Sequence, residues 1–450
     1  MIVLKFGGTS VGSAENARNV VEIIRSRLGR KPVVVVSALS GVTDVLYRIA
    51  GGEDVQQNIA FLQKRHFDLL CELVPEGILR DGVMEKLQMI LDSVESSAAG
   101  EISERRKAYI ISSGELMSST IMAAALCASG IATAWADARG LIIASGDPMK
   151  AQPELEEINE RVPQEIGEAF AQSGGGISPD AVITQGFICA SASGKSAVLG
   201  RGGSDYSASL IGAALNAEAV EIWTDVDGVR TADPRRVPTT RCLREISYEE
   251  ATEMAHFGAK VLHPLTLEPA KTLNIPVYVL NTANPDGECT VILNHEQVHS
   301  PVKSVSYKVD ILVISMRSKL PIDTSGFIKK IFDVFSENRI DVDLVSTNNA
   351  WISVTVDASQ KNIGRALERM GEFADVLTDS EKSQISAIGS NTIVMSGILK
   401  MTFAPLRDSR IYMISPGASS VNISFVVDRE RLNEILCQTH KYLIEDASCD

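Results

Sequence analysis

The stretch LGRGGSDYSASLIGAAL, residues 199–215, joins an apolar segment to a helical pattern through three glycines and an arginine. After Tyr206 the apolar residues recur at the spacing of one helix face: Leu210, Ala214 and Leu215. Ser204 or Asp205 is a suitable N-cap, so the glycines precede a predicted helix N-terminus. Free N–H groups and the helix dipole favour an anion there. A plain strand-to-helix turn with a solvated Arg201 is the alternative.

The composition is that of a folded protein with several domains. The chain has 450 residues, of which 45% are hydrophobic and 22% charged, and domains of about 100–200 residues predict two to four of them. The net charge of -14 argues against nucleic acid or an acidic membrane as a partner, because phosphate binding needs an excess of Lys and Arg. A bound phosphate must therefore meet a local positive site.

The cysteines and the N-terminus predict a cytoplasmic location. The seven cysteines are scattered without CxxC spacing, as is typical of reduced thiols. Lys5 interrupts the first apolar residues, so they do not resemble the apolar core of a signal peptide. No apolar run approaches the ~18 residues of a membrane span.

Residues 1–295 alternate between strand and helix patterns. The predicted strands are IVLKFG, PVVVVSAL, IATAWAD, AVITQGFICA, AVEIWTD and IPVYVLN. Helices are expected from Ser13, across residues 55–129, after Ser204, and from the capping-box pattern Ser247-x-x-Glu250. Short Val- and Ile-rich strands separated by helices predict an α/β domain, with a mostly parallel sheet covered on both faces.

Residues 305–450 contain an internal repeat. SGFIKKIFDVFSENRIDVDLVSTNNAWISVTVD, residues 325–357, aligns without gaps on SGILKMTFAPLRDSRIYMISPGASSVNISFVVD, residues 396–428, at an offset of 71 with ten identities in 33 pairs. Each unit predicts a Gly-led helix, a short strand, a polar turn and an alternating strand, which must pair with its neighbour to cover a sheet. We interpret the pair as regulatory modules, with a simple dimerisation domain as the alternative.

Several short motifs place polar groups after apolar segments. Lys5 is followed by Gly7 and Gly8 in neither the Walker A nor the GxGxxG order, yet a lysine beside free N–H groups can hold phosphates. Further candidates are Thr43 in SALSGVTD, Glu115 in ISSGELMSS, and Thr224 and Asp225 in WTDVDGVRTADPR. Each alone also has a structural interpretation as a cap, a turn or a solvated residue. His256 and His263 match no HExxH pattern, and we predict no protein metal site.

Taken together and in this order, the motifs resemble the aspartokinases, members of the amino-acid kinase family. The resemblance covers essentially the whole chain: KFGGTS, the SGxT loop, SSGELMS, TQGF, GRGGSD, WTDVDGVRTADPR, FGAKVLHP and two C-terminal modules similar to ferredoxin-like ACT domains. It implies transfer of the ATP γ-phosphate to the side-chain carboxylate of L-aspartate, with Mg²⁺ bound mainly through the nucleotide. That carboxylate, with a pKa near ~3.9, needs no general base, so catalysis should consist of positioning and charge neutralisation.

The resemblance also implies roles for individual residues. The catalytic residues are Lys5 and Asp205, with Asp205 orienting Lys5. The aspartate-binding residues are Arg201 for the α-carboxylate, Glu115 for the α-ammonium, and Thr43, Phe187 and Ser204. The nucleotide-binding residues are Lys5, Gly7, Gly8, Thr224, Asp225, Arg230, Arg235 and Lys260.

The likeness is to the monofunctional, lysine-sensitive type, which binds its effector at an ACT–ACT interface between two chains. The implied effector residues are Ser325, Gly326, Phe327, Val342 and Asp343, with Asp343 pairing with an effector ammonium. We expect a homodimer through these modules, or a tetramer, with feedback inhibition by L-lysine and with threonine as the alternative effector. Asp44 and Arg230 depart from the pattern of many relatives. Another amino-acid kinase, acting on glutamate, acetylglutamate or UMP, and a catalytically silent amino-acid sensor are the rival interpretations.

Overall fold

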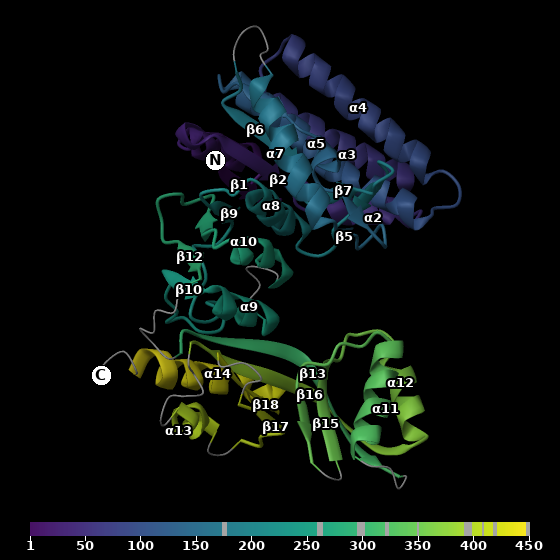
Figure 1. Ribbon diagram of the computed structural model, residues 1–450, viewed down its shortest axis with the longest axis vertical. Coiled ribbons are helices and arrows are strands. Elements are labelled where there is room, and N and C mark those ends of the chain that lie inside the picture. Colours follow the sequence, from purple (N-terminus) through teal and green to yellow (C-terminus); the bar gives the residue numbers. More distant parts are fainter. Residues whose placement is uncertain are drawn as a thin grey trace. The chain divides into compact units, whose positions relative to one another are not determined.

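The chain forms two compact units, coloured along the sequence in Figure 1. The computed structural model describes residues 1–172, 178–258, 264–294, 302–319, 324–348, 351–390, 398–406, 409–416 and 421–446. The first unit comprises Met1–Val229, Cys242–Tyr248 and Val261–His295. The second comprises Arg230–Arg241, Glu249–Lys260 and Glu296–Asp450. Two segments of the region expected to form the kinase domain, 230–241 and 249–260, thus belong to the second unit.

The first unit is built on an eight-stranded sheet in the order β10-β12-β11-β9-β1-β2-β6-β3. Its strands are β1 (Ile2–Phe6), β2 (Pro32–Val36), β3 (Thr133–Trp135), β6 (Ala181–Gln185), β9 (Val220–Thr224), β10 (Glu245–Ser247), β11 (Val277–Asn281) and β12 (Thr290–Leu293). All neighbouring pairs are parallel except β11 with β12. The predicted mostly parallel sheet is confirmed, and the short strands β10 and β12 are additions to the predicted set.

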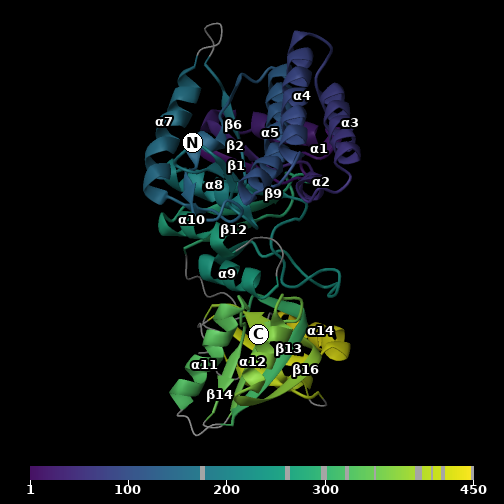
Figure 2. The same cartoon turned by 90° about the vertical axis from the view of Figure 1, so that its right-hand side faces the viewer.

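Helices cover both faces of this sheet, as the sequence predicts (Figure 2). One layer contains α1 (Ala14–Arg25), α2 (Val42–Ala50), α3 (Val55–Leu73), α4 (Ile78–Ala98) and α5 (Glu104–Ala128). The other contains α7 (Leu155–Ala171), α8 (Gly203–Ala214) and α10 (Glu268–Thr272). Ile2, Leu4 and Phe6 join the core of the first layer, while the alternating residue Val3 is also fully buried. Burial on both faces explains why the strands are continuous apolar runs.

Smaller elements complete the first unit. They are α6 (Ala138–Leu141) and two hairpins, β4 (Ala144–Ser145) with β5 (Gln152–Pro153) and β7 (Ile188–Ala190) with β8 (Ser196–Val198). Helix α5 is the one helix in the described part of the chain that is long and apolar enough to cross a membrane. Its most apolar window is 89% buried inside the protein, which is the environment of a core helix.

The helix N-termini show one success and one error of the sequence analysis. Ser13 caps α1, because its side chain accepts a hydrogen bond from the Asn16 N–H. Helix α8 is capped by Gly202, at a φ of 72°, and not by Ser204 or Asp205. The left-handed conformation of this glycine starts the helix earlier and places both polar residues inside its first turn.

The second unit is a six-stranded antiparallel sheet in the order β14-β15-β13-β16-β18-β17. Its strands are β13 (Ser304–Ser318), β14 (Val345–Thr347), β15 (Trp351–Asp357), β16 (Ala374–Ile388), β17 (Met413–Ser415) and β18 (Asn422–Asp428). Its helices are α9 (Tyr248–His256, of which Tyr248 belongs to the first unit), α11 (Thr324–Glu337), α12 (Ile363–Gly371), α13 (Ile398–Phe403) and α14 (Leu432–His440). The predicted helix, short strand and alternating strand therefore occur twice, each preceded by a long strand and followed by a helix.

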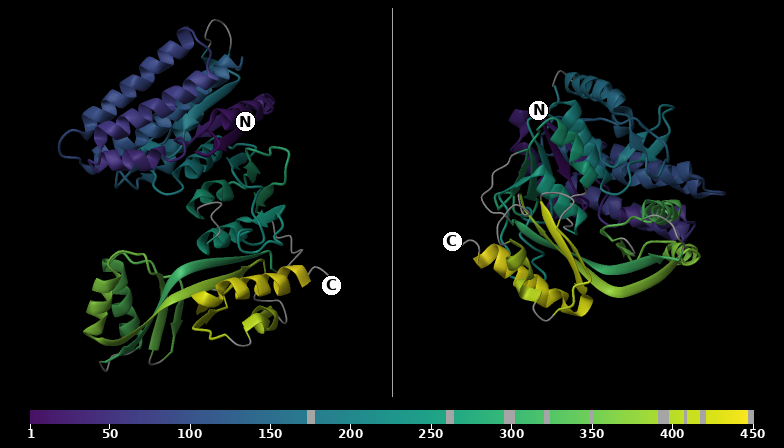
Figure 3. Two further views of the ribbon diagram at one scale, coloured as in Figure 1. Left: turned by 180° about the vertical axis from the view of Figure 1, so that it is seen from behind. Right: turned by 60° about the horizontal axis from the view of Figure 1, so that its bottom comes forward.

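The repeat extends to details of the backbone. The 15-residue strands β13 and β16 pair along the centre of the sheet, and each contains an irregularity. Asp310 in β13 and Glu381 in β16 have φ angles of 57° and 56° and are related by the same sequence offset as the repeat. Figure 3 shows these strands running between helices α11 and α12 at one end and α13 and α14 at the other.

Each half of the second unit has its own apolar core. The first module packs Phe327, Ile331 and Met370 against Ile314 and Ile352. In the core of the second module, Phe425 of the repeat and Leu436 of α14 pack with two residues of the 230–241 segment, Ala232 and Val237. That segment is therefore an integral part of the second module.

Candidate functional site

Loops that follow four parallel strands meet at one edge of the first sheet. The Gly7 N–H donates to the Trp223 carbonyl at 3.2 Å, and the Ser37 N–H donates to the Phe6 carbonyl at 3.1 Å. The Gly186 N–H likewise donates to the Val36 carbonyl at 2.9 Å. These bonds fix the ends of β1, β2, β6 and β9 side by side, and the carboxyl edge of a parallel sheet is where ligands bind in such folds.

Lys5 and Asp205 form an ion pair at this edge. Lys5 Nζ lies 2.6 Å from Asp205 Oδ1, and the two side chains are only 11% and 16% exposed. Their contact is an ion pair rather than a well-directed hydrogen bond. Lys5 comes from the end of β1 and Asp205 from the first turn of α8, so the sheet and the helix fix both groups.

The glycines after β1 leave room next to this lysine. A Cβ atom on Gly8 would lie 2.6 Å from the Ala38 carbonyl oxygen, so no other residue fits there without a backbone shift. A Cβ on Gly7 would lie 3.6 Å from Lys5 Nζ. The absence of a side chain on Gly7 leaves the space beside the ammonium group open to a ligand, while Gly8 allows the loop after β1 to pack closely on the loop after β2.

Glu115 supplies a buried carboxyl group at the same edge. It lies in α5 and is 3% exposed, and its Oε1 accepts a hydrogen bond from the Ala38 N–H at 3.1 Å. Its Oε2 is buried and has no hydrogen-bond partner among the described residues. Burial raises the pKa of Glu115 to about 8. A cation placed at Oε2 would be strongly favoured, because it would replace the solvation that this carboxylate has lost.

Close packing holds the loop after β2 against α5. A Cβ on Gly114 would lie 2.9 Å from the Ala38 Cβ, and the Ser118 hydroxyl donates to the Ser37 carbonyl at 2.7 Å. Thr43, the second residue of α2, is half-buried in this region. Tyr47, which was not predicted from the sequence, also lies in this region, and its pKa is raised by burial and by the charges of Glu115 and Asp44. Its spacing of one helical turn from Thr43 is a signal that could have found it.

The glycine-rich loop before α8 packs tightly on the loop after β6. A Cβ on Gly203 would lie 2.7 Å from the Phe187 ring, and one on Gly186 would lie 2.6 Å from the Ser204 Cβ. Phe187 itself has a φ of 67°. Ser204 and Phe187 therefore come together in the structure.

Arg201 lies between two left-handed glycines of this loop. Gly200 and Gly202 have φ angles of 83° and 72°. Arg201 is exposed and forms no ion pair with any residue that the structure describes. Its guanidinium group is available to an anionic ligand beside the N-terminus of α8.

The predicted nucleotide residues divide between the two units. Thr224 and Asp225 follow β9 in the first unit, where the Thr224 hydroxyl donates to Asp225 Oδ1 at 3.2 Å. Arg230, in the second unit, donates from Nε to the Thr240 hydroxyl at 2.9 Å and from Nη2 to the Thr240 carbonyl at 2.6 Å. Lys260 and His263 lie outside the described residues.

Arg235 is also bonded within its own loop. Its Nε and Nη2 donate to the two carboxylate oxygens of Asp233 at 2.9 and 2.8 Å. This bidentate contact with Arg235 lowers the pKa of Asp233 to about 2. The Arg230 and Arg235 guanidinium groups thus both have partners within the second unit and keep further N–H donors, on Nη1, for another ligand.

The predicted effector residues form two groups. Ser325, Gly326 and Phe327 lie in the first turn of α11, and Phe327 packs edge-on against Phe373. Val342 and Asp343 come after the C-terminal end of this 14-residue helix, which is about 21 Å long at 1.5 Å per residue. One chain therefore holds the two groups at opposite ends of α11.

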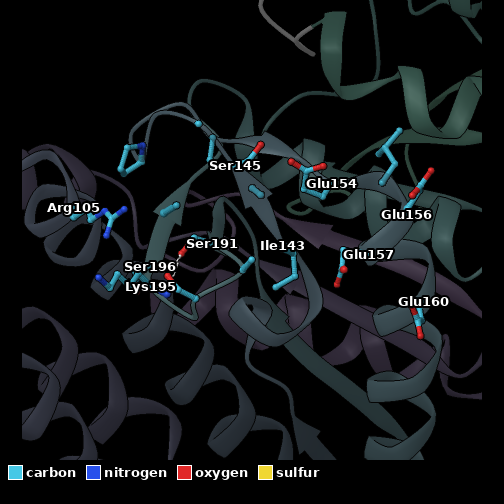
Figure 4. A pocket seen from close by; sticks show the side chains of 18 residues that line it. Arg105, Ile143, Ser145, Glu154, Glu156, Glu157, Glu160, Ser191, Lys195 and Ser196 are labelled. Carbon is cyan, nitrogen blue, oxygen red and sulfur yellow. Dashed lines mark hydrogen bonds between the residues drawn. The ribbon is translucent and has the colours of Figure 1, made fainter.

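A surface cleft of about 1020 Å³ lies elsewhere on the first unit. Figure 4 shows Arg105 and Lys195 at one side of it and Glu154, Glu156, Glu157 and Glu160 at the other. None of the predicted site residues lines it. The described residues also contain no group of three or more His, Cys, Asp or Glu side chains arranged to hold a metal ion.

Comparison with known proteins places the chain in a family. Residues 1–281 match the amino acid kinase family. Because this match spans more than half of the chain, the chain belongs to the amino acid kinase family. The tandem repeat of the second unit has the antiparallel architecture expected of paired ACT modules.

Within that family the chain is similar to aspartokinases over its whole length. The lysine-sensitive aspartokinase 3 of Escherichia coli is 30% identical over 455 residues, which cover 99% of both chains. The structure of E. coli aspartokinase III in complex with aspartate and ADP matches 98% of this chain and 99% of that one, with a TM-score of 0.85 and 29% identity. The complex of that enzyme with lysine and aspartate matches 99% of each chain, with a TM-score of 0.81 and 29% identity.

Proposed function

We propose that the chain is an aspartate kinase, which transfers the γ-phosphate of ATP to the side-chain carboxylate of L-aspartate and yields 4-phospho-L-aspartate. This reaction is the first step of lysine, threonine and methionine biosynthesis. The observation that carries the proposal is the buried Glu115 carboxylate, with its unpartnered Oε2, on the same sheet edge as the Lys5–Asp205 ion pair. The relative solved with aspartate and ADP supports this pair of substrates.

Aspartate would bind through charges of both signs. Its α-ammonium would meet Glu115 Oε2, which has no other partner among the described residues. Its α-carboxylate would meet the exposed guanidinium of Arg201, whose planar fork suits a carboxylate. Thr43, Phe187 and Ser204 would complete the pocket. The free side-chain carboxylate, already ionised at neutral pH, would be the nucleophile.

The phosphates would bind at the Lys5 end of the same edge. Lys5 and the N–H groups after Gly7 and Gly8 would neutralise the charge of the transferred phosphoryl group. Asp205 would hold the ammonium of Lys5 in place, since the two groups already form an ion pair at 2.6 Å. Thr224 and Asp225 would contact the nucleotide. Arg230 and Arg235 would contribute through the N–H groups that Thr240 and Asp233 do not use.

Mg²⁺ would enter with the nucleotide and supply charge neutralisation on the phosphates. The described residues offer no cluster of acidic or imidazole groups for a protein-bound cation. Among the described residues, the carboxylate in contact with Lys5 is that of Asp205, which is paired with this lysine. Phosphate oxygens are therefore the main ligands that the proposal assigns to the ion.

The second unit would bind lysine between two chains. The complex of the E. coli relative with lysine supports this choice of effector. Because Gly326 and Asp343 lie at opposite ends of α11, one chain does not close both groups around one amino acid. A homodimer through the ACT modules would bring the two groups together. The reduced, scattered cysteines favour a cytoplasmic enzyme.

The direct test is ADP release with ATP, Mg²⁺ and a series of acceptors. L-Aspartate should be the preferred acceptor over L-glutamate, N-acetyl-L-glutamate and UMP, because Arg201 and Glu115 match an amino acid with a free ammonium. An equal or higher rate with any of the other three acceptors would contradict the proposal. Complete inactivity with all four would favour a silent amino-acid sensor.

A further inference from the structure

The carboxylate expected to bind an effector already has a cationic partner within the chain. Asp343 Oδ1 lies 2.7 Å from Lys308 Nζ, and the two side chains are 12% and 24% exposed. Lys308 belongs to β13, four residues after the strand begins. The Asp343 N–H donates to the Thr355 carbonyl at 2.9 Å, so the backbone that carries the carboxylate is fixed by β15.

The C-terminal end of helix α9 lies next to the Lys308–Asp343 ion pair. His256 Nε2 lies 3.7 Å from Asp343 Oδ1, and Lys308 Nζ lies 5.7 Å from the centre of the Phe257 ring. Burial, followed by the charge of Lys308, lowers the pKa of His256, so its ring is neutral at neutral pH. Lys308 is therefore the cation that Asp343 meets among the described residues.

The backbone that follows α9 packs closely on β13. Gly258 has a φ of 110°, and a Cβ there would lie 2.1 Å from the Tyr307 carbonyl oxygen. Farther along α9, Glu250 accepts a hydrogen bond from Lys303 Nζ at 2.9 Å and another from the Ser390 hydroxyl at 2.7 Å. From Glu250 onward, α9 therefore contacts the segments next to β13 and β16 of the second unit. The residues that follow its last turn contact Tyr307 and Lys308.

We propose that Lys308 is an internal competitor at the effector site, whose ammonium occupies Asp343 until an effector with a side-chain ammonium displaces it. The inference rests on the proposed role of Asp343 in effector binding. An ammonium group on the effector can bind the Asp343 carboxylate only if the contact between Asp343 and Lys308 is broken. Lys308 therefore determines both how tightly the site binds an effector and which amino acids it selects. An amino acid without a side-chain cation gains nothing from the exchange.

Displacement of Lys308 would also allow the effector to influence the first unit through helix α9. When Lys308 leaves Asp343, the contact that joins β13, the end of α9 and the segment after α11 is broken. Helix α9 continues directly from Tyr248, which belongs to the first unit and whose hydroxyl donates to the Ile275 carbonyl. An effector that favours the displaced arrangement therefore biases a helix covalently joined to the sheet that bears the catalytic edge.

The test is the affinity for lysine of the full-length protein and its variants, measured by isothermal titration calorimetry. Lys308→Met should bind lysine about five- to tenfold more tightly than the parent, the gain expected from removing one competing, partly buried ion pair. Lys308→Arg keeps a cation at this position and should stay within about twofold of the parent. Threonine affinity should be unchanged in all of them.

Lys382→Met is the matched control in the second module. Lys382 is also a mostly buried lysine, 11% exposed, and lies 3.0 Å from Asp428. Lys382 pairs with Asp428 and not with Asp343. Removing its charge should therefore leave lysine binding unaltered. Thermal unfolding of each variant checks that it is folded, and Lys308→Gln replaces Lys308→Met if the methionine variant is not.

The outcomes separate this inference from the proposed activity. Unchanged or weaker lysine binding by a folded Lys308→Met or Lys308→Gln variant would overturn it, as would the absence of lysine binding in parent and variant alike. ADP release with aspartate, measured on the same preparations, reports independently on the kinase activity. A parent that binds lysine but transfers no phosphate would refute the proposed reaction and leave the Lys308 comparison standing.

Discussion

The two modules of the second unit share a backbone but differ in charge at equivalent positions. Their cores are conserved in kind: Phe327 of the first module corresponds to Ile398 of the second, and both are buried. The partners of the proposed effector site are not repeated. Asp343 corresponds to Ile414, which is 44% exposed, and Lys308 corresponds to Asp379. The second module therefore cannot bind an ammonium by the same pair of groups.

The second module instead packs against a segment from earlier in the chain, residues 230–241. Ala232 and Val237 enter its core, and Thr231 is within hydrogen-bonding distance of His440, at 2.8 Å in a buried position. The guanidinium of Arg236 also lies over the Tyr307 ring at 4.6 Å. One repeat of the fold thus carries the proposed binding group, while the other packs against the 230–241 segment. The two modules share the packing of their cores but not the charged side chains at these equivalent positions.

The largest effect is expected from a substitution in the first unit, which should reduce phosphate transfer without changing lysine binding by the two modules. Lys5→Ala should lower kcat by ~10²–10³-fold, because the ammonium is needed most as charge develops on the transferred phosphate. The KM for aspartate should change far less, and lysine should still bind the second unit. Steady-state ADP release and calorimetry measure the two properties. A near-normal kcat would mean that Lys5 has no part in the reaction.

The next effect should locate sensing in the first module alone. Asp343→Ala should abolish inhibition by lysine or weaken it by about 5–150-fold, the range of typical coupling energies. Uninhibited turnover should remain within about twofold of the parent, because the proposed catalytic groups belong to the other unit. Ile414→Ala, at the equivalent position of the second module, is the control and should leave inhibition intact. A parent indifferent to millimolar lysine would contradict the assignment.

The sequence predicted those features that follow from local patterns. Val- and Ile-rich strands between helices identified the parallel sheet, and the repeat identified the modules, because both are written in short-range periodicity. The residues at the proposed catalytic edge, Lys5, Glu115 and Asp205, came from ordered motifs and not from spacing. The docking of segments 230–241 and 249–258 on the second unit had no local signal, since Ala232 and Val237 are ordinary small apolar residues in a turn. The strands β10 and β12 were missed because runs of three and four residues are too short to show a period.

A smaller effect concerns pH and applies to the first unit only. Burial raises the pKa of Glu115 to about 8, so in the free protein the side chain is mostly neutral below that pH. Binding of the aspartate ammonium requires the carboxylate, and the KM for aspartate should rise by up to about tenfold for each pH unit below 8. Glu115→Gln should bind aspartate weakly and lose this pH dependence. A KM that does not change between pH 6.5 and 9 would argue against the assignment.

The same pKa has a consequence for stability with the opposite pH dependence. The folded pKa of Glu115 lies above its unfolded value, so the protonated group favours the folded state. Its contribution is fully present below the model-peptide value of about 4.5 and is lost as the pH rises through about 8. Thermal unfolding of the parent should therefore lose stability over this window relative to Glu115→Gln, and aspartate should restore it.

The smallest effect should test the anchoring role of the second module. Val237→Ala removes two methyl groups from a side chain that is 2% exposed, and should lower the free energy of unfolding by about 1 to 2 kcal/mol. Lysine affinity should be unchanged, since the first module has a separate core without residues of the 230–241 segment. Chemical denaturation and calorimetry measure the two quantities. If Val237→Ala instead weakens lysine binding in proportion to its loss of stability, the two modules share one cooperative core, and the division between a sensing and an anchoring module fails.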